Sequence, residues 1–188
     1  MIKELTLIGI LIDPTADVEC LAKNMYYEAR NQNLAGMLAV TNVVFNRVND
    51  VRFPNSICKV VQQGPTAKSI KEPDVEYPLR HKCQFSWYCD GKPDDPINLE
   101  AYSYARGLAY EIIEGTFPYL DITDGALFYH ADYVKPEWSV IFKQSLKLND
   151  HIFYKWDWHG REPYDILSCN KFFSYILYSV FTYIIYYI

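Results

Sequence analysis

Two consecutive amphipathic segments near the N-terminus constrain the fold more than any other feature of the chain. In the first segment, apolar residues recur three or four positions apart: Val18, Leu21, Ala22, Met25 and Ala29. The spacing returns after a short polar stretch, residues 31–33, as Leu34, Met37, Leu38, Thr41, Val44, Phe45 and Val48. This period is typical of α-helices that bury one face, and Asp17 is a suitable N-cap for the first of them. We therefore predict two helices, 18–30 and 34–49, joined by a tight turn.

One acidic side chain, Glu28, has an unusual place in the first predicted helix. At about 100° per residue, it falls beside Leu21, on the edge of the apolar stripe rather than on the solvated face. A carboxyl group at such a border loses hydration, which favours its neutral form and raises its pKa toward neutrality. A protonated acid of this kind can donate a proton to a leaving group. Because Arg30 follows closely, an ordinary surface ion pair of small energetic worth fits the same pattern.

The middle of the chain predicts a mainly α (α+β) domain with long loops. Pro and Gly recur over residues 50–98 and break any long element, so we expect loops with at most a short hairpin. Long ordered loops in compact domains are often binding walls. A third helix is predicted over residues 98–114 and ends at Gly115.

The later part of the domain predicts one further helix between two extended pieces. Pro136 suits the first turn of a helix that continues through Leu146. The stretches GALFYHADYV, residues 125–134, and HIFYKW, residues 151–156, are rich in aromatic residues and are expected to be extended. The β element of the domain is therefore minor.

Charge and cysteine content argue against two kinds of site. A net charge of −5 and a pI near 5.3 argue against a broad basic surface for nucleic acid, since such binding depends on neutralising phosphates. The chain has five cysteines without a CxxC pair: Cys20, Cys58, Cys83, Cys89 and Cys169. They form no metal-ligand signature, and neither a metal nor another cofactor is expected. Cys83 and Cys89 bracket QFSWY and could form a disulfide, although buried free thiols fit at least as well.

The two ends of the chain differ from the domain between them. The N-terminal apolar run is only about eight residues long and lacks a small-residue cleavage site, so no signal peptide is expected. Residues 172–188 carry no charge, Gly or Pro and reach the short limit of the about 17 to 25 residues that span a bilayer. The sequence leaves three roles open for this tail: a membrane anchor, a helix or strand docked on the domain, or neither of these. The chain thus divides into an N-terminal segment, 1–17, a main domain, 18–164, and a hydrophobic tail, 165–188.

Several blocks of the sequence occur in the order of one known family. CLAKNMYYEARNQNLAGMLAVTNVVFNRVNDVRFPNSICKVV is followed by QFSWYCDG, GALFYHADYVKPEW and HIFYK, from about residue 18 to residue 155. This string resembles the SleB/CwlJ-type cell wall hydrolases, which occur among spore-germination enzymes and bacteriophage lysis proteins. The resemblance implies a lysozyme-like, mostly helical fold. It also implies cleavage of the peptidoglycan glycan strand between N-acetylmuramic acid and N-acetylglucosamine, in the lytic transglycosylase manner. The family's catalytic glutamate belongs to its EAR motif, which here is Glu28.

The same blocks imply which residues surround Glu28. QFSW contributes Ser86 and Trp87, and YHA contributes Tyr129 and His130, all four expected to bind substrate. A hydroxyl of Ser86 or Tyr129 could hydrogen-bond the Glu28 carboxyl or a sugar acetamido group. We expect Trp87 either to stack on a sugar ring or to pack in the core. His130 is expected either to touch substrate or to act as a structural donor.

The chain departs from the family pattern beside the predicted acid. Relatives usually have His-Glu-Ala-Arg-Gly, where this sequence has Tyr27 and Asn31 in place of the His and the Gly. Asn tolerates positive φ best among non-glycine residues, so the turn is expected to survive. A role of that histidine beside the acid is not carried over to Tyr27. Asn46 and Arg47, in FNRV, are expected to be structural and to hold the loop over the first helix.

The chemistry expected of Glu28 has two routes. The protonated acid would donate its proton to the glycosidic oxygen, and the oxocarbenium-like centre is then captured by water or by the muramoyl 6-hydroxyl. The second route gives a 1,6-anhydro product and needs one carboxylate, whereas hydrolysis commonly uses two. The sequence singles out no second acid, because the candidates lie in predicted loops: Asp90, Asp94, Asp95, Asp121, Asp124 and Asp132. This favours the transglycosylase route.

The expected protein is an enzyme of the bacterial cell wall, from a phage or a bacterium, that acts as a monomer on peptidoglycan glycan strands. Membrane association through the tail stays open. One alternative is a non-catalytic peptidoglycan-binding module on the same fold, but a binder gains nothing from a partly desolvated acid such as Glu28. Another is a membrane-associated interaction protein whose tail is the functional end. Since cell walls are anionic and the chain is acidic, Arg80, Lys82 and Lys92 are expected to guide the substrate.

Overall fold

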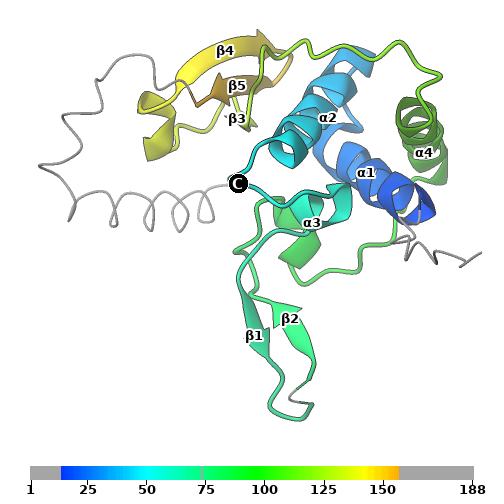
Figure 1. Ribbon diagram of the computed structural model, residues 1–188, viewed down its shortest axis with the longest axis vertical. Coiled ribbons are helices and arrows are strands. Elements are labelled where there is room, and N and C mark those ends of the chain that lie inside the picture. Colours follow the sequence, from blue (N-terminus) through cyan, green and yellow to red (C-terminus); the bar gives the residue numbers. More distant parts are fainter. Residues whose placement is uncertain (1–13, 73, 157–188) are drawn as a thin grey trace, which may run out of the picture.

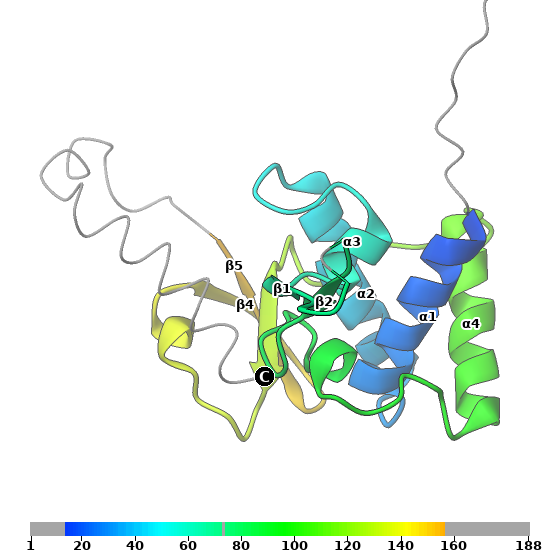
Figure 2. The ribbon, with the colours of Figure 1, turned by 90° about the horizontal axis from the view of Figure 1, so that it is seen from below.

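Helices form the body of the domain, and the mainly α (α+β) class is confirmed. The computed structural model describes residues 14–72 and 74–156 (Figure 1). In this part of the chain there are four α-helices: α1 (Pro14–Ala29), α2 (Leu34–Asn49), α3 (Ile57–Val61) and α4 (Leu99–Ile113). α1 packs against the other three, and Figure 2 shows it running between α4 and α2.

α1 begins one turn earlier than predicted. Its apolar stripe, from Val18 to Ala29, is buried as expected. Pro14 occupies the first position, which tolerates proline because the N–H there has no partner within the helix. Asp17 therefore lies inside the first turn, and its carboxylate accepts a hydrogen bond of 3.3 Å from the backbone N of Cys58. The prediction that Asp17 is the N-cap was wrong.

α2 has the predicted bounds but lies deeper than its periodicity indicated. Asn33 caps the helix by accepting a hydrogen bond of 3.0 Å from the backbone N of Gly36. The buried residues cover most sides of the helix: Gly36, Met37, Ala39, Val40, Thr41, Asn42, Val43, Val44 and Arg47. α2 contacts both α1 and α3, and a helix that is surrounded in this way buries residues outside a single stripe.

α4 forms where it was predicted. Asn98 is its N-cap and accepts a hydrogen bond of 3.0 Å from the backbone N of Ala101. The helix ends before Gly115, whose φ of +72° lies in the left-handed region that glycine adopts without strain. Its buried residues pack the helix onto α1: Ala105, Leu108, Ala109 and Ile112.

A three-stranded antiparallel sheet completes the domain. Its strands lie in the order β3 (Phe128–Ala131), β5 (His151–Lys155) and β4 (Lys143–Leu148). The two extended pieces predicted from the aromatic stretches are β3 and β5. Tyr129 pairs with Phe153, and Ala131 pairs with His151, so these four side chains share one face of the sheet.

The prediction of a helix from Pro136 through Leu146 is wrong. A single 3-10 turn, η2 (Glu137–Val140), follows Pro136, and the chain then enters β4. Leu146 and Leu148 alternate with polar neighbours, which is the period of a strand. Asn149 adopts a φ of +49° and tightens the turn into β5. Pairing with β5 thus decides the structure of this segment.

The long region between α2 and α4 is mostly loop, with short elements in it. α3 was not predicted. The short hairpin is present as β1 (Thr66–Lys68) and β2 (Glu76–Pro78), and it projects from the body of the domain (Figure 1). A second 3-10 turn, η1 (Ser86–Cys89), follows the hairpin and leads back toward α1.

Disulfides hold two parts of this region. Cys20–Cys58 ties α1 to α3, and Cys83–Cys89 closes the segment that contains η1. For Cys83 and Cys89, the sequence left two alternatives open, a disulfide or two free thiols, and the structure has the disulfide. The fifth cysteine, Cys169, lies outside the described residues.

Both ends of the chain, residues 1–13 and 157–188, also lie outside the described residues. The predictions about a signal peptide and about the hydrophobic tail concern these ends and stay predictions. Among the helices of residues 14–72 and 74–156, none is long and apolar enough to cross a membrane.

Candidate active site

A cavity of about 300 Å³ lies where the end of α1 meets η1 and the sheet. Glu28 lines it from α1, Ser86 and Trp87 from η1, and Tyr129 and His130 from β3. The structure therefore brings all five residues that the sequence singled out to one cavity. Their roles in it differ.

Glu28 is held by a hydrogen bond from the sheet. Tyr129 donates its hydroxyl to Oε2 of Glu28 across 2.8 Å. Burial raises the pKa of Glu28 from 4.5 to about 7, although the Tyr129 hydrogen bond and the charge of Arg47 both act to lower it. Burial also raises the pKa of Tyr129 well above 10, so its hydroxyl keeps the proton that it donates. Near neutral pH, both forms of Glu28 are populated.

Arg47 lies behind this pair, inside the protein. It is 2% exposed, and its Nε donates a hydrogen bond of 2.7 Å to the backbone oxygen of Leu127. The guanidinium lies over the rings of Phe53, Phe85 and Phe128, at 5.2, 5.4 and 5.6 Å from their centroids. Burial lowers its pKa to about 10, which keeps it charged at neutral pH. Arg47 thus has the structural role expected of it and also places a positive charge near Glu28.

The electrostatic role of Arg47 was missed, although the sequence contains a signal for it. Val40, Val43 and Val44 precede Arg47 by seven, four and three positions, so the arginine lies on the buried face of its helix. A buried arginine needs a nearby acceptor or negative charge. Position on the apolar face, rather than the FNRV block, was the informative feature.

Trp87 is part of the wall rather than a free stacking platform. It is buried, and its Nε1 donates a hydrogen bond of 3.2 Å to Oδ1 of Asn24. The ring stacks on that of Tyr27, with centroids 4.8 Å apart and an angle of 16°. Tyr27, the residue that replaces the family's histidine, therefore covers one face of the indole. Core packing, one of the two roles left open for Trp87, accounts for these contacts.

His130 is committed to structural hydrogen bonds. Its Nδ1 lies 2.9 Å from the backbone oxygen of Ala131, and its Nε2 lies 3.0 Å from the hydroxyl of Tyr154. Because a carbonyl can only accept, Nδ1 carries the proton and Nε2 accepts from Tyr154. The ring also stacks on Tyr154 and meets Trp138 edge-on. Of the two roles considered for His130, the geometry fits the structural one.

A further part of the cavity wall comes from the turn between β4 and β5. Gln32 donates a hydrogen bond of 3.0 Å from Nε2 to Asp150, and Asn149 donates one of 2.9 Å to Asn33. These bonds attach the turn to the connection between α1 and α2. As a result, Asp150 and His151 line the cavity together with Glu28. The sequence analysis named neither residue.

Asp150 changes the conclusion about acids near Glu28. Among the described residues that line the cavity, it is the one carboxylate besides Glu28. The aspartates considered from sequence have other contacts: Asp124 pairs with Lys155, and Asp132 pairs with Lys147 at 3.0 Å. A second carboxylate therefore reaches the cavity from the β4–β5 turn, a segment that the sequence analysis placed between a helix ending at Leu146 and a strand beginning at His151.

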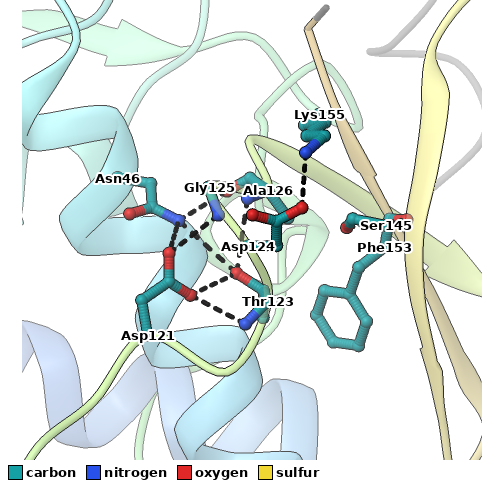
Figure 3. Close-up of polar contacts among 9 residues, drawn as sticks. All are labelled: Asn46, Asp121, Thr123, Asp124, Gly125, Ala126, Ser145, Phe153 and Lys155. Carbon is teal, nitrogen blue, oxygen red and sulfur yellow. Dashed lines mark hydrogen bonds and ion pairs between the residues drawn. The ribbon is translucent and has the colours of Figure 1, made fainter.

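Asp121 organises the loop that leads into β3 (Figure 3). It accepts hydrogen bonds from the backbone N of Thr123 and Gly125, both at 2.8 Å, and one of 3.1 Å from Asn46. Burial acts to raise the pKa of Asp121, but these hydrogen bonds outweigh it and the pKa is lowered. Asn46 also donates to the backbone oxygen of Ala126 at 3.0 Å. The structural role expected of Asn46 agrees with these contacts, although the loop that it holds is this one.

The turn after Glu28 does not depend on a left-handed residue. In residues 14–72 and 74–156, the non-glycine residues with positive φ are His81, Asp124 and Asn149. Asn31 is not among them, so the turn survives as expected, but without the positive φ that Asn tolerates.

The basic residues expected to guide substrate, Arg80, Lys82 and Lys92, do not line the cavity. Arg80 donates to the backbone oxygen of Asp90, and Lys92 pairs with the Asp90 carboxylate at 3.5 Å.

Comparison with known sequences identifies the class of this helical domain, whose cavity contains the partly buried Glu28. Residues 31–154 match the sequence profile of the family described as Cell Wall Hydrolase. The chain therefore belongs to the cell wall hydrolase family, and the resemblance expected from the sequence is confirmed. The matched region begins three residues after Glu28 and includes the other residues expected in the site.

Curated proteins with similar sequences are spore cortex-lytic enzymes. The spore cortex-lytic enzyme of Bacillus cereus is 29% identical over 140 residues, which are 74% of this chain and 44% of that protein. That of Bacillus subtilis strain 168 is 28% identical over 138 residues, 73% of this chain and 37% of that protein. The chain thus spans less than half the length of these relatives.

Two catalytic domains of known structure also match. That of the Bacillus cereus SleB protein has 28% identity and a TM-score of 0.49, and the match covers 74% of this chain and 89% of that one. That of the germination-specific lytic transglycosylase SleB from Bacillus anthracis has 27% identity and the same TM-score, with 79% and 100% covered.

Proposed function

We propose that this protein cleaves the glycan strand of peptidoglycan between N-acetylmuramic acid and N-acetylglucosamine, with Glu28 as general acid and then base, in the lytic transglycosylase manner. One observation carries the proposal: a carboxyl group with a pKa of about 7 lines the cavity and is oriented by the Tyr129 hydroxyl. An acid with a pKa near the working pH is suited to both halves of such a reaction. Membership of the cell wall hydrolase family supports the choice of substrate.

In the first step, protonated Glu28 gives its proton to the glycosidic oxygen while the bond from that oxygen to C1 breaks. The departing sugar leaves with a hydroxyl group, and positive charge develops at C1. Glu28 becomes a carboxylate in a site that is poorly hydrated. The hydrogen bond from Tyr129 and the charge of Arg47 both stabilise this form, because each lowers the pKa of Glu28. They therefore assist proton release when it is needed.

In the second step, the Glu28 carboxylate takes a proton from the muramoyl 6-hydroxyl as that oxygen bonds to C1. The product is a 1,6-anhydro sugar, and Glu28 is protonated again for the next cycle. One carboxylate serves both steps. Burial favours the return of the proton, because it raises the pKa of the free carboxyl group.

Hydrolysis is the second candidate reaction, and Asp150 is the observation that favours it. A hydrolase commonly uses a second carboxylate to activate water or to hold the sugar cation. Asp150 lines the same cavity from the β4–β5 turn and accepts a hydrogen bond from Gln32. The two reactions give different sugar ends, so the products distinguish them.

The test is mass spectrometry of soluble fragments after the full chain is incubated with purified peptidoglycan. Glu28→Gln keeps the shape of the side chain but cannot donate the proton, and Asp150→Asn removes the other carboxylate. Anhydromuropeptides from the unmodified chain and from Asp150→Asn, with none from Glu28→Gln, are the expected result. Reducing ends that disappear in Asp150→Asn would identify a hydrolase. No fragments from the unmodified chain would contradict the proposal and favour a binding module.

We further propose that the enzyme acts at the bacterial cell wall, which its family description supports. We also propose that it is a monomer from a phage or a bacterium. The apolar composition of residues 165–188 supports a membrane attachment of the chain. Removal of these residues should then shift the protein from the membrane fraction to the soluble fraction without loss of lytic activity. An unchanged distribution would contradict this part.

A further inference from the structure

One histidine of the cavity has a polar atom without a partner. His151 is 8% exposed, and in the part of the chain that the structure describes its Nδ1 is buried without a hydrogen bond. Buried polar atoms in proteins are nearly always hydrogen-bonded, so such an exception calls for an explanation. His151 also lines the cavity that contains Glu28. A ligand in that cavity is the simplest source of a partner.

The position of His151 is set by the sheet. It is the first residue of β5, pairs with Ala131 and lies on the same face as Tyr129. Its ring meets the ring of Tyr129 edge-on, with centroids 5.2 Å apart and an angle of 86°. Tyr129 in turn donates to Glu28. His151 therefore contacts the residue that hydrogen-bonds Glu28, the proposed acid.

A second residue of the cavity also has an unpartnered polar atom. The hydroxyl of Tyr27, in the last turn of α1, is buried and has no hydrogen bond within the described residues. Tyr27 and His151 belong to different elements, and each leaves a polar atom unsatisfied. Rings with polar atoms at their edges suit a sugar, which has apolar faces and a rim of hydroxyl and acetamido groups. Two such atoms in one cavity point to a shared polar ligand.

We propose that His151 is a substrate-binding residue, whose Nδ1 hydrogen-bonds a hydroxyl or acetamido group of the glycan beside the bond that is cleaved. This inference rests on the proposed function and names a recognition contact for it. A neutral imidazole has one donor and one acceptor nitrogen, so it can bind either kind of group. Burial lowers the pKa of His151, which keeps the ring neutral at neutral pH. The Tyr27 hydroxyl is suited to a second contact on the same sugar.

A purely structural role makes a different prediction. If His151 only supports the ring of Tyr129, any flat ring of similar size should serve. His151→Phe keeps a ring against Tyr129 but has no nitrogen atoms. His151→Asn loses the ring but keeps a hydrogen-bonding group near the position of Nδ1. The two variants therefore separate support of Tyr129 from recognition of the substrate.

Binding is measured with a soluble oligosaccharide of alternating N-acetylglucosamine and N-acetylmuramic acid, in full-length protein that carries Glu28→Gln to prevent turnover. Adding His151→Phe should raise the Kd about tenfold, the usual effect of losing one hydrogen bond. His151→Asn should stay closer to the parent. With Glu28 present, His151→Phe should raise KM more than it lowers kcat. An unchanged Kd and KM in His151→Phe would overturn the proposal.

A binding measurement on protein that retains His151 covers the case in which His151→Phe does not fold. The ¹⁵N signals of the histidine rings are followed in the Glu28→Gln protein as the oligosaccharide is added, with the His151 signals assigned by their loss in His151→Asn. The Nδ1 signal of His151 should shift on binding, and a shift absent at saturation would overturn the proposal. Binding without any product from the unmodified chain would contradict the proposed function but not this contact. No binding by the parent would overturn both.

Discussion

Tyr129 donates a hydrogen bond of 2.8 Å to Glu28 and so joins β3 to α1 across 101 positions of the chain. The bond fixes the carboxyl group of an acid whose pKa is about 7. It acts against the effect of burial, because it stabilises the ionised form of Glu28. The hydroxyl therefore influences both where the carboxyl group lies and how readily it releases its proton.

Removing this hydroxyl should shift the pH dependence of catalysis. In Tyr129→Phe, the pKa of Glu28 should rise, because a contact that lowers it is lost while burial remains. We expect kcat to fall about tenfold, in line with the loss of one hydrogen bond to a charged group. The basic limb of the pH profile, where Glu28 loses its proton, should move to higher pH. Peptidoglycan turbidity assays over a pH series measure both effects.

The matched control is Tyr154→Phe on the opposite face of the same sheet. Tyr154 donates its hydroxyl to His130 rather than to Glu28. Its loss should leave the position of the basic limb unchanged. If both variants gave the profile of the unmodified protein, the Tyr129 hydroxyl would not influence Glu28 in solution.

Glu28 should also make the protein less stable as the pH rises. Its pKa is about 7 in the folded protein and 4.5 ordinarily, so its contribution to stability is complete below pH 4.5 and is lost as the pH passes about 7. The loss is at most about 3 kcal/mol in the free energy of unfolding. Glu28→Gln resembles the protonated form, so it should be more stable than the unmodified protein at pH 8 and similar at pH 4. Urea unfolding at the two pH values measures this.

A surface glutamate offers a control of opposite sign. The pKa of Glu19 is lowered, chiefly by a hydrogen bond from Tyr102 and also by Arg106. Its contribution to stability is therefore present at high pH and lost as the pH falls. Glu19→Gln should reduce stability at pH 8, where Glu28→Gln increases it. Equal signs for the two variants would contradict the assignment for Glu28.

Local periodicity predicted α1, α2 and α4 and the place of Glu28, because these depend on neighbours within one or two turns. The stripe of α1 put Glu28 at the border between apolar and polar faces, and the structure buries that stripe. The same reasoning failed after Pro136, where a favourable helix start competes with a strand that pairs with β5. Pairing partners that lie apart in the sequence are not visible in a local pattern.

The cavity itself was predicted only in part. Ser86 and Tyr129 came from blocks of a family resemblance, and the structure brings them together with Glu28. Asp150 and His151 reach the cavity because the β4–β5 turn is attached to the α1–α2 connection by side-chain hydrogen bonds. Such contacts between two turns follow no periodicity, so the local pattern contained no signal for them. The one available signal was the family block HIFYK, which begins with His151.

Arg47 should be required for stability as well as for the acid. Arg47→Met removes the hydrogen bond to the backbone oxygen of Leu127 and leaves that oxygen buried without its partner. We expect a loss of about 2 kcal/mol in the free energy of unfolding, the usual range for a hydrogen bond from a charged group. The pKa of Glu28 should rise, because the positive charge that lowers it is gone. Urea unfolding and the pH profile of activity test these two effects separately.

Arg47→Lys is the informative companion to that variant. Lysine keeps the charge but lacks the planar group that lies over the three rings. It should leave the pKa of Glu28 nearer its value in the unmodified protein while still reducing stability. If Arg47→Met kept the pH profile of the unmodified protein, the charge of Arg47 would have no part in the chemistry.

The two disulfides should have different consequences when they are removed. Cys83–Cys89 closes the segment that carries Trp87, whose ring stacks on Tyr27 beside Glu28. Replacing both cysteines by serine should raise KM, because the wall of the cavity loses its constraint, and should cost about 2 kcal/mol in stability for a loop of this length. Cys20–Cys58 spans 38 positions, and its removal should cost about 4 kcal/mol while KM at low temperature stays the same. Thermal unfolding and steady-state kinetics on both double variants measure the difference. An equal rise in KM for the two would show that Cys83–Cys89 has no special role at the cavity.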